Sequence, residues 1–251
     1  MKFFKQIKII QKLFLLSLIG ITIYIPDSVY ADGSFIDKVY HPYVQPNEKE
    51  IEWRWNYKND SGKSEEAKLR DGAQQHRIAY GQSLNDRWFL EGYLVGERNK
   101  NQDFKLTSVE LEAIWQITEQ GEYDQDWGML FELEHERELD ITEVSSALLV
   151  EQEWGRWVGT ANLYLIYEWG NKIDNEFETA MALQGRYRYS KALEPAIEFY
   201  SSDTSEGIGP VLMGSIKLAG RKKIHWETGV IFGLDNQTAD QTLKMLIEFE
   251  F

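Results

Sequence analysis

The last nine residues, Leu243-Lys244-Met245-Leu246-Ile247-Glu248-Phe249-Glu250-Phe251, carry the pattern that decides the fold class. Every odd position in this stretch holds a large apolar side chain, and three of the four even positions are charged. Successive side chains of a β-strand point to opposite faces of the sheet. A period of two therefore predicts a strand with one apolar and one polar face.

The same period continues through the chain before this stretch. Ile51, Trp53 and Trp55, for example, alternate with Glu52 and Arg54. Neither a helix of useful length nor an interdomain linker is expected after the first 31 residues. We predict about twelve strands, near residues 49–58, 74–83, 87–98, 104–117, 126–137, 144–154, 157–169, 176–190, 193–201, 210–218, 223–233 and 241–251.

The connections between these strands fall into a short set and a longer, polar set that roughly alternate. The short turns are near residues 85–86, 155–156 and 191–192; the longer loops are near 59–73, 99–103, 170–175, 202–209 and 234–240. The connection at 118–125 is longer than this scheme requires. Short turns at one rim and longer loops at the other are typical of a transmembrane β-barrel.

Residues 1–31 have the layout of a secretory signal. Four lysines between residues 2 and 12 precede an apolar stretch at 13–25, and small or branched side chains stand at Val29 and Ala31. The apolar stretch has about 13 residues, shorter than the roughly 20 that a spanning helix needs. We therefore expect cleavage after Ala31 and export from the cytoplasm, although a retained anchor is the alternative.

Composition excludes several classes of protein. The 251 residues include 27 Lys and Arg against 41 Asp and Glu, a net charge of −14. Removing residues 1–31 takes away four Lys and Asp27 and leaves 23 basic and 40 acidic residues, a net charge of −17. This acidity argues against a nucleic-acid partner, since such proteins need a basic face. The absence of Cys excludes disulfides, thiolate metal sites and a Cys nucleophile. We expect no cofactor and no metal.

A soluble β-sandwich is the alternative to a membrane barrel. The aromatic content of 14% is high for so acidic a chain, and rings crowd the strand ends, where a barrel carries its two interfacial girdles. In lipid every backbone N–H and C=O must be paired internally, so only helices and closed barrels can span. We therefore predict an all-β, antiparallel up-and-down barrel. The predicted membrane-interface aromatics are Trp53, Trp55, Trp88, Trp115, Trp127, Trp154, Trp157, Trp169, Phe249 and Phe251.

If the apolar faces contact lipid, the charged faces line the lumen. Acids exceed bases about three to one in this inward set, so an open lumen would favour cations. A narrow lumen filled by Glu/Arg networks is the structural alternative. The predicted lumen-lining residues are Glu52, Arg54, Glu91, Glu110, Glu112, Glu132, Glu134, Glu151, Glu153, Glu168, Glu178, Arg186, Arg188, Glu198, Glu227, Lys244 and Glu248.

Two stretches resemble a known group of proteins. They are residues 39–46 with 50–54 (VYHPYVQP and EIEWR), and the ending at 229–234 and 243–251. Together they are similar to uncharacterised Gram-negative outer-membrane proteins of the style of the phenol meta-pathway porins. This resemblance implies an outer-membrane barrel with a transport role and supplies no catalytic residues. The strand ending on Phe251 also resembles the signal that the barrel-insertion machinery recognises.

The second alternative to a pore is an enzyme, an outer-membrane hydrolase. The chain has four histidines, His41, His76, His135 and His225, and none is followed two residues later by Ser, as in lipid-cleaving barrels. Pairing of His135 with Ser145 or Ser146 across a hairpin stays open. So does a rim site of Asp140, Asp174 or Asp203 with a His. The loop acids Asp235 and Asp240 could hold Ca²⁺ or bridge divalent ions to lipopolysaccharide, although simple solvation is the blander role.

We expect three regions: the signal at 1–31, a periplasmic segment at 32–48 and the barrel at 49–251. Whether residues 32–48 enter the barrel as a plug stays open, as does the oligomeric state. The expected partners are outer-membrane lipid and lipopolysaccharide, the insertion machinery, and small solutes or cations. The expected function is an outer-membrane pore for small solutes, and no enzymatic activity is expected.

Overall fold

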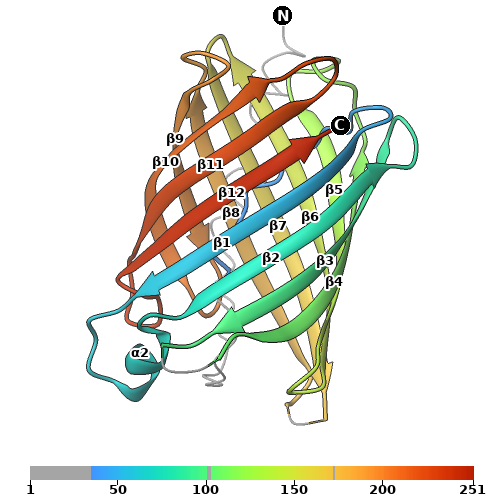
Figure 1. Ribbon diagram of the computed structural model, residues 1–251. Coiled ribbons are helices and arrows are strands. Elements are labelled where there is room, and N and C mark those ends of the chain that lie inside the picture. Colours follow the sequence, from blue (N-terminus) through green and yellow to red (C-terminus); the bar gives the residue numbers. More distant parts are fainter. Residues whose placement is uncertain (1–34, 101–102, 172) are drawn as a thin grey trace, which may run out of the picture. The chain divides into compact units, whose positions relative to one another are not determined.

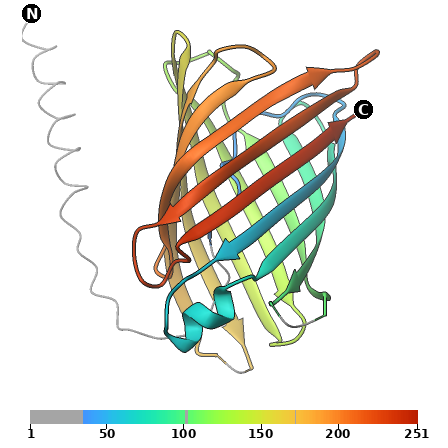
Figure 2. The ribbon, with the colours of Figure 1, turned by 60° about the vertical axis from the view of Figure 1, so that its left-hand side comes forward.

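Twelve antiparallel strands close into a barrel in the computed structural model, which describes residues 35–100, 103–171 and 173–251. Each strand pairs with its neighbours in the chain, and β12 pairs with β1 to complete the ring. Figures 1 and 2 show the closed wall from two sides. The predicted all-β up-and-down barrel of about twelve strands is confirmed. The predicted signal at 1–31 lies outside the described residues.

The strands agree closely with the ranges expected from the period of two. They are β1 (Lys49–Asn59), β2 (Gln74–Ser83), β3 (Trp88–Arg98), β4 (Lys105–Gln116), β5 (Asp126–Glu136), β6 (Ile141–Trp154), β7 (Trp157–Gly170), β8 (Glu176–Tyr187), β9 (Glu194–Ser201), β10 (Glu206–Lys217), β11 (Lys223–Gly233) and β12 (Gln241–Glu250).

The largest differences occur where turn-forming residues obscure the pattern. The sequence predicts that β10 starts near residue 210, whereas it starts at Glu206 and includes Pro210. The pairing of β10 with β11 omits Gly209 and Pro210, because a proline has no N–H to donate to a ladder. A Cβ at Gly209 would lie 1.8 Å from the carbonyl oxygen of Val230, so only glycine fits this close approach.

One short helix, α2 (Glu65–Arg70), interrupts the loop between β1 and β2. Ser64 caps it by accepting a hydrogen bond from the N–H of Ala67 at 3.1 Å, and Glu65 and Glu66 place negative charge in its first turn. The sequence analysis expected no helix here, because six residues are too few to show a period of 3.6. None of the described helical residues forms a segment with the length and apolar character needed to span a membrane.

The barrel has two different rims. At the rim where β1 starts and β12 ends, called the terminal rim here, the turns are residues 84–87, 117–125, 155–156, 188–193 and 218–222. The opposite rim, called the loop rim, carries residues 60–73, 99–104, 137–140, 171–175, 202–205 and 234–240. An even number of strands places both ends of the barrel at one rim.

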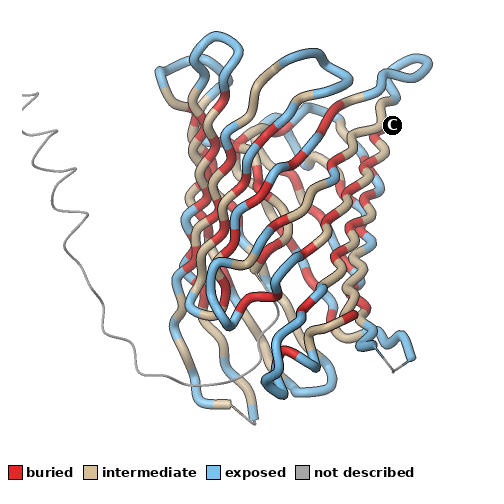
Figure 3. Tube along the Cα trace, turned by 90° about the vertical axis from the view of Figure 1, so that its left-hand side faces the viewer, coloured by how far each residue is buried: buried red, intermediate tan, exposed pale blue. Residues whose placement is uncertain are grey.

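Buried and exposed residues alternate along the strands, as Figure 3 shows. The exposed outer face is rich in large apolar side chains, including Ile78, Leu94, Leu111, Leu165 and Ile197. Many of the buried positions between them are polar or charged, including Glu52, Glu112, Asn162 and Glu198. This arrangement is inside-out compared with a soluble protein, and it suits a wall surrounded by lipid.

Candidate functional site: a polar lumen occupied by residues 35–48

Residues 35–48, called the inner segment here, run through the inside of the barrel. The segment contains no helix or strand, and Ile36, Val39, Tyr40 and Val44 are all at most 6% exposed. Its side chains and backbone contact inward-facing residues of β1, β4, β5, β6, β7 and β9. Only a position within the lumen reaches so many strands. For residues 35–48, these contacts favour the plug alternative that the sequence left open over the expected periplasmic segment; residues 32–34 lie outside the described residues.

Side-chain amides of the wall satisfy the backbone of the inner segment. Asn162 accepts a hydrogen bond from the N–H of Tyr40 at 2.7 Å and donates to the Tyr40 carbonyl at 2.8 Å. Gln116 accepts from the N–H of Val44 at 2.7 Å. A buried backbone group without a partner is costly. These amides therefore provide the hydrogen bonds that a neighbouring strand would otherwise provide. The segment is therefore held mainly by side chains, with one backbone hydrogen bond from the N–H of Ser83 to the Glu48 carbonyl at 3.0 Å, and it adds no strand to the sheet.

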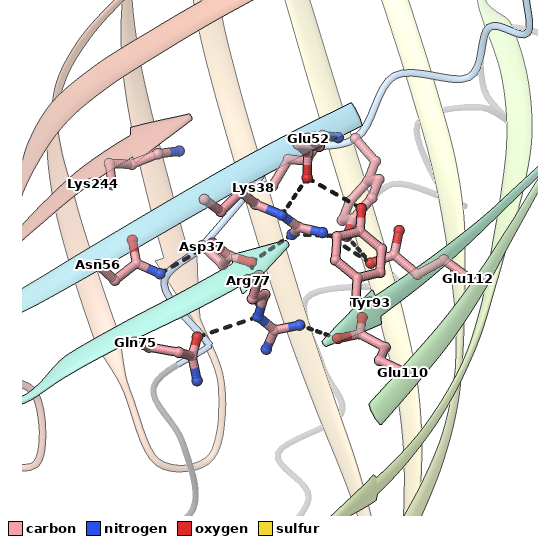
Figure 4. Close-up of polar contacts among 12 residues, drawn as sticks. Asp37, Lys38, Glu52, Asn56, Gln75, Arg77, Tyr93, Glu110, Glu112 and Lys244 are labelled. Carbon is pink, nitrogen blue, oxygen red and sulfur yellow. Dashed lines mark hydrogen bonds and ion pairs between the residues drawn. The ribbon is translucent and has the colours of Figure 1, made fainter. Parts of the chain in front are cut away.

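Arg54 is the centre of an ionic network between wall and segment. Its guanidinium lies 2.6 Å from Asp37 of the segment, 2.6 Å from Glu52 and 3.2 Å from Glu112. The ring of Tyr93 lies 4.5 Å from the guanidinium carbon. Lys38 donates to Glu52 at 2.6 Å. Figure 4 shows the labelled Lys38, Glu52, Tyr93 and Glu112 close together in one region of the lumen. The planar fork of an Arg side chain suits such simultaneous contacts with several carboxylates.

The half of the inner segment that lies nearer the terminal rim makes a second set of polar contacts with the wall. His41 lies 2.5 Å from Glu151, and the hydroxyl of Tyr43 donates to Asp126 at 2.7 Å and to Glu151 at 3.1 Å. Glu151 also accepts from Thr160 at 2.9 Å. His41 thus contacts a buried carboxylate of β6 inside the wall.

The predicted lumen residues fall on the inward phase of their strands. Glu52, Arg54, Glu110, Glu112, Glu151, Glu198, Glu227 and Lys244 are buried, and Glu248 is 9% exposed. Glu132, Glu134, Glu168 and Arg186 are half-buried. Glu153 and Arg188 lie at the terminal rim, where they form an exposed ion pair at 2.6 Å. Their role in lining a conducting path stays a prediction.

Several inward residues were missed by the sequence analysis. Arg77 binds Glu110 and lies 3.7 Å from Asp37. Tyr93, Tyr164 and Tyr200 are buried in the lumen, although we expected aromatic rings mainly at the rims. These residues can be identified from their position in the inward–outward alternation of the strand rather than from their residue type. Tyr93, for example, stands two positions after Glu91 and shares its face.

The predicted interface aromatics occupy different heights on the outer wall. Trp88 and Trp115 stack with ring centroids 5.6 Å apart at the terminal rim, where Trp127, Trp154, Trp157, Phe249 and Phe251 also lie. Trp169 lies at the loop rim, whereas Trp53 and Trp55 lie further from the ends of β1. Contact of these rings with a membrane interface stays a prediction.

The hydrogen-bond partners of His135 and His225 differ from those that the hydrolase hypotheses require. His135 contacts Thr142 at 3.1 Å, and Ser145 donates to Glu132 instead. Ser215 and His225, which the sequence analysis did not connect, face each other across β10 and β11 at 2.5 Å. Within the described residues no carboxylate bonds the other ring nitrogen of His225, so the third member of a hydrolase triad is not assembled.

The loop acids considered for Ca²⁺ are used within the loops. Asp235 accepts from the N–H groups of Gln237 and Thr238 at 3.0 and 2.7 Å. Asp240 accepts from the hydroxyl and the N–H of Ser61 at 2.5 and 2.9 Å, which joins two loops and holds the pKa of Asp240 below its usual value. These bonds favour a structural role for both loop acids.

Closure of the barrel also assembles two groups of three carboxylates that chain spacing does not reveal. One is Glu110, Glu112 and Glu132; the other is Glu50, Glu52 and Glu248. In each group, one oxygen atom from every residue lies within 4.8 Å of the others. The first group is served by protein donors, since Arg77 binds Glu110, Tyr40 and Arg54 bind Glu112, and Ser145 binds Glu132.

Glu48 ends the inner segment at the terminal rim and is expected to make stability pH-dependent. Burial raises its pKa to about 8, and the neighbouring Glu250 and Glu248 carboxylates add to this rise against the opposing Lys223. The folded protein therefore favours protonated Glu48. The resulting stabilisation is complete below the ordinary value of about 4.5 and is lost as the pH rises through about 8.

This prediction is tested by urea unfolding of the detergent-folded barrel between about pH 6 and about pH 9. The wild-type midpoint should fall across this range more steeply than that of Glu48→Gln, whose side chain stays neutral. Equal slopes for the two proteins would contradict the assignment to Glu48.

The comparisons with known proteins agree with this architecture. No family model and no curated protein matches the sequence. Among solved structures, the COG4313 outer membrane channel from Pseudomonas putida F1 has a TM-score of 0.56 and 12% identity, covering 88% of this chain and 100% of that chain. The fold is that of an outer-membrane porin.

Two further porins support this statement about the fold. The KdgM porin in complex with disordered oligogalacturonate has a TM-score of 0.52 and 10% identity, covering 80% of this chain and 98% of that chain. The NanC porin has a TM-score of 0.51 and 11% identity, with the same coverage of 80% and 98%. At these identities the shared property is the barrel, and the chemistry of the lumen belongs to this chain's own residues.

Proposed function

We propose that this protein is an outer-membrane channel for small solutes whose path is narrowed by the inner segment. The observation that carries this proposal is a porin-type barrel whose lumen holds a segment attached by side-chain contacts rather than by a strand ladder. Side-chain contacts can be exchanged one at a time, whereas a strand ladder is cooperative. A path can therefore open without loss of the wall.

The charge of the lumen supports small cations or neutral solutes over anions. Buried inward carboxylates such as Glu112, Glu151 and Glu198 outnumber the buried inward bases Arg54 and Lys244. A low-dielectric wall strengthens the field of such charges and repels anions. This argues against an acidic polymer such as the oligogalacturonate named with the KdgM porin.

Orientation and assembly follow from the two rims. We place the terminal rim in the periplasm, since short turns face that side in outer-membrane barrels. The N–H of Phe251 donates to the Lys49 carbonyl at 2.9 Å, which closes β12 onto β1. The stacked rings of Phe249 and Phe251 at this rim support recognition by the insertion machinery. Lipid and lipopolysaccharide would surround the apolar wall.

A structural barrel with a permanently filled lumen is the second candidate. The burial of Glu52, Arg54 and Glu112 and their mutual ion pairs favour it. The two candidates differ in whether any ionic path exists once the inner segment is displaced.

Planar-bilayer recording in a salt gradient tests the proposed channel. We expect single-channel events with a reversal potential on the cation-selective side. The double variant Glu132→Gln, Glu134→Gln should shift the reversal potential toward zero, because two half-buried inward carboxylates lose their charge. Anion selectivity would overturn the acidic-lumen argument. Absence of conductance, both in the full chain and after deletion of the inner segment, would favour the structural barrel.

A further inference from the structure

Two buried carboxylates near the terminal rim have no hydrogen-bond or ion-pair partner among the described residues. Glu50 is 5% exposed and Glu248 is 9% exposed. No described residue gives either side chain a hydrogen bond or an ion pair within 4.0 Å. Both belong to the carboxylate group that Glu52 completes, called the rim triad here (Glu50, Glu52, Glu248).

The register of the sheet forces these side chains together. Glu52 of β1 lies directly opposite Glu248 of β12, and Glu50 stands two positions from Glu52 on the same inward face. Glu91 on β3 adds a further buried carboxylate nearby, and its Oε1 also has no hydrogen-bond partner. Adjacent buried carboxylates repel one another, and each unpaired charge is costly to bury.

The protein supplies too little positive charge to this region. Lys38 donates to Glu52 at 2.6 Å, and Arg54 lies 2.6 Å from the other oxygen of the same residue. Lys223 binds Glu250 at the rim. These contacts satisfy Glu52 and Glu250. Lys38 also attracts Glu50 and Glu248, and Lys223 attracts Glu248, but neither cation lies within 4.0 Å of these two carboxylates.

A small cavity lies at the terminal rim, beside Glu250. It has a volume of about 70 Å³ and is lined by Glu48, Lys223 and Glu250 among others. Glu250 is the register partner of Glu50, but none of the three triad residues lines this cavity, whose lining also includes Lys49 and Arg221.

We propose that the rim triad is a binding site for one hard divalent cation of the Ca²⁺ or Mg²⁺ class. Carboxylate oxygens are the ligands that such ions prefer, at about 2.0–2.6 Å, and one oxygen from each residue already lies within 4.8 Å of the others. The Glu110, Glu112 and Glu132 group carries no such proposal, because each member already has at least one protein donor, although Oε2 of Glu112 has none. The site does not depend on conduction by the barrel.

Calorimetric titration of Ca²⁺, and separately Mg²⁺, into the full folded chain tests the proposal. The protein is refolded in detergent without lipopolysaccharide and stripped with a chelator, which removes lipid-bound ions as a source of signal. We expect saturable binding of one ion per chain. Glu50→Gln and Glu248→Gln should each raise the dissociation constant by about tenfold or more, since each removes a charged ligand.

Two further variants separate ligation from a general effect of charge. Glu227→Gln removes a buried inward carboxylate on β11 that lies 3.6 Å from Lys244, and should leave the affinity unchanged. Lys38→Gln removes the protein's own cation from Glu52, and should tighten binding. Heat-modifiable migration on gels confirms that each variant is folded.

Absence of binding by the folded wild-type protein up to millimolar ion would overturn the proposal and leave shared protons as the means of neutralising the triad. Equal binding by wild type, Glu50→Gln and Glu248→Gln would also overturn it, since the ion would then sit elsewhere. If either triad variant fails to fold, the opposite-sign effect of Lys38→Gln remains as the decisive measurement, and weaker or unchanged binding by that variant would refute the site.

Discussion

Deletion of residues 35–44 is expected to raise the single-channel conductance by about tenfold or more, because these residues occupy the lumen of a twelve-stranded barrel. The deletion removes Asp37, Lys38 and Tyr40 while every wall strand stays intact. Planar-bilayer recording of the wild-type and deleted proteins measures the effect. Unchanged conductance would show that the inner segment does not limit the path.

A single substitution should displace the segment without shortening the chain. Pro42 lies against Gly128 of β5, where a Cβ would come within 2.9 Å of the proline Cβ. Gly128→Leu should therefore expel this part of the segment and raise conductance in the same direction. Gly92→Leu is the matched control, because a Cβ at Gly92 meets nothing within 4 Å. Equal conductance of the two variants would argue against the assigned path of the segment.

The absence of cysteine makes an independent accessibility measurement possible. Thr160 is 3% exposed on the inward face of β7, beneath the half of the inner segment that lies nearer the terminal rim. A charged thiol reagent should react slowly with Thr160→Cys in the full chain and quickly after deletion of residues 35–44. Fast labelling in both proteins would mean that water already reaches this position.

The second large effect is expected at Arg54. Replacement by Met should destabilise the barrel by about 3–5 kcal/mol, because it leaves Asp37, Glu52 and Glu112 buried without their shared cation. Arg54→Lys should fall between wild type and Arg54→Met, since an ammonium cannot reproduce the fork of three contacts. Urea unfolding in detergent at neutral pH measures these differences.

The rim pair of Arg188 and Glu153 provides the control for this experiment. It has two short contacts of 2.6 Å, but its side chains are 32% and 35% exposed. Arg188→Met should therefore cost less than about 1 kcal/mol, as is usual for pairs in contact with water. A similar loss of stability for the Arg54 and Arg188 variants would contradict the central role assigned to Arg54.

The sequence predicts the strands of the wall well, because the direction of the side chains in a strand repeats every two residues. The alternation in β1 and β4 identifies which side chains face inward, and Arg54 and Glu112 lie where this phase puts them. Prediction is poorer where one residue interrupts the pattern, as Pro210 does in β10, or where an element is too short to repeat, as α2 is.

The inner segment could not be placed from sequence because it has no period and no partners nearby in the chain. Tyr40 meets Asn162, which is 122 residues away, and Glu112, which is 72 residues away. Nothing local marks these residues as a set. The Ser215–His225 contact has the same cause, since it depends on the register between β10 and β11.

The sequence by itself thus determined the all-β class, the alternation along the strands and the surplus of acidic residues, since each can be read from the chain without its fold. Only the tertiary structure decided what fills the lumen and which carboxylates share a cation or lack one. Closure of β1 onto β12 brings Glu50, Glu52 and Glu248 together from opposite ends of the barrel sequence. Electrostatic energy depends on distance in space, and no pattern of neighbouring residues contains that distance.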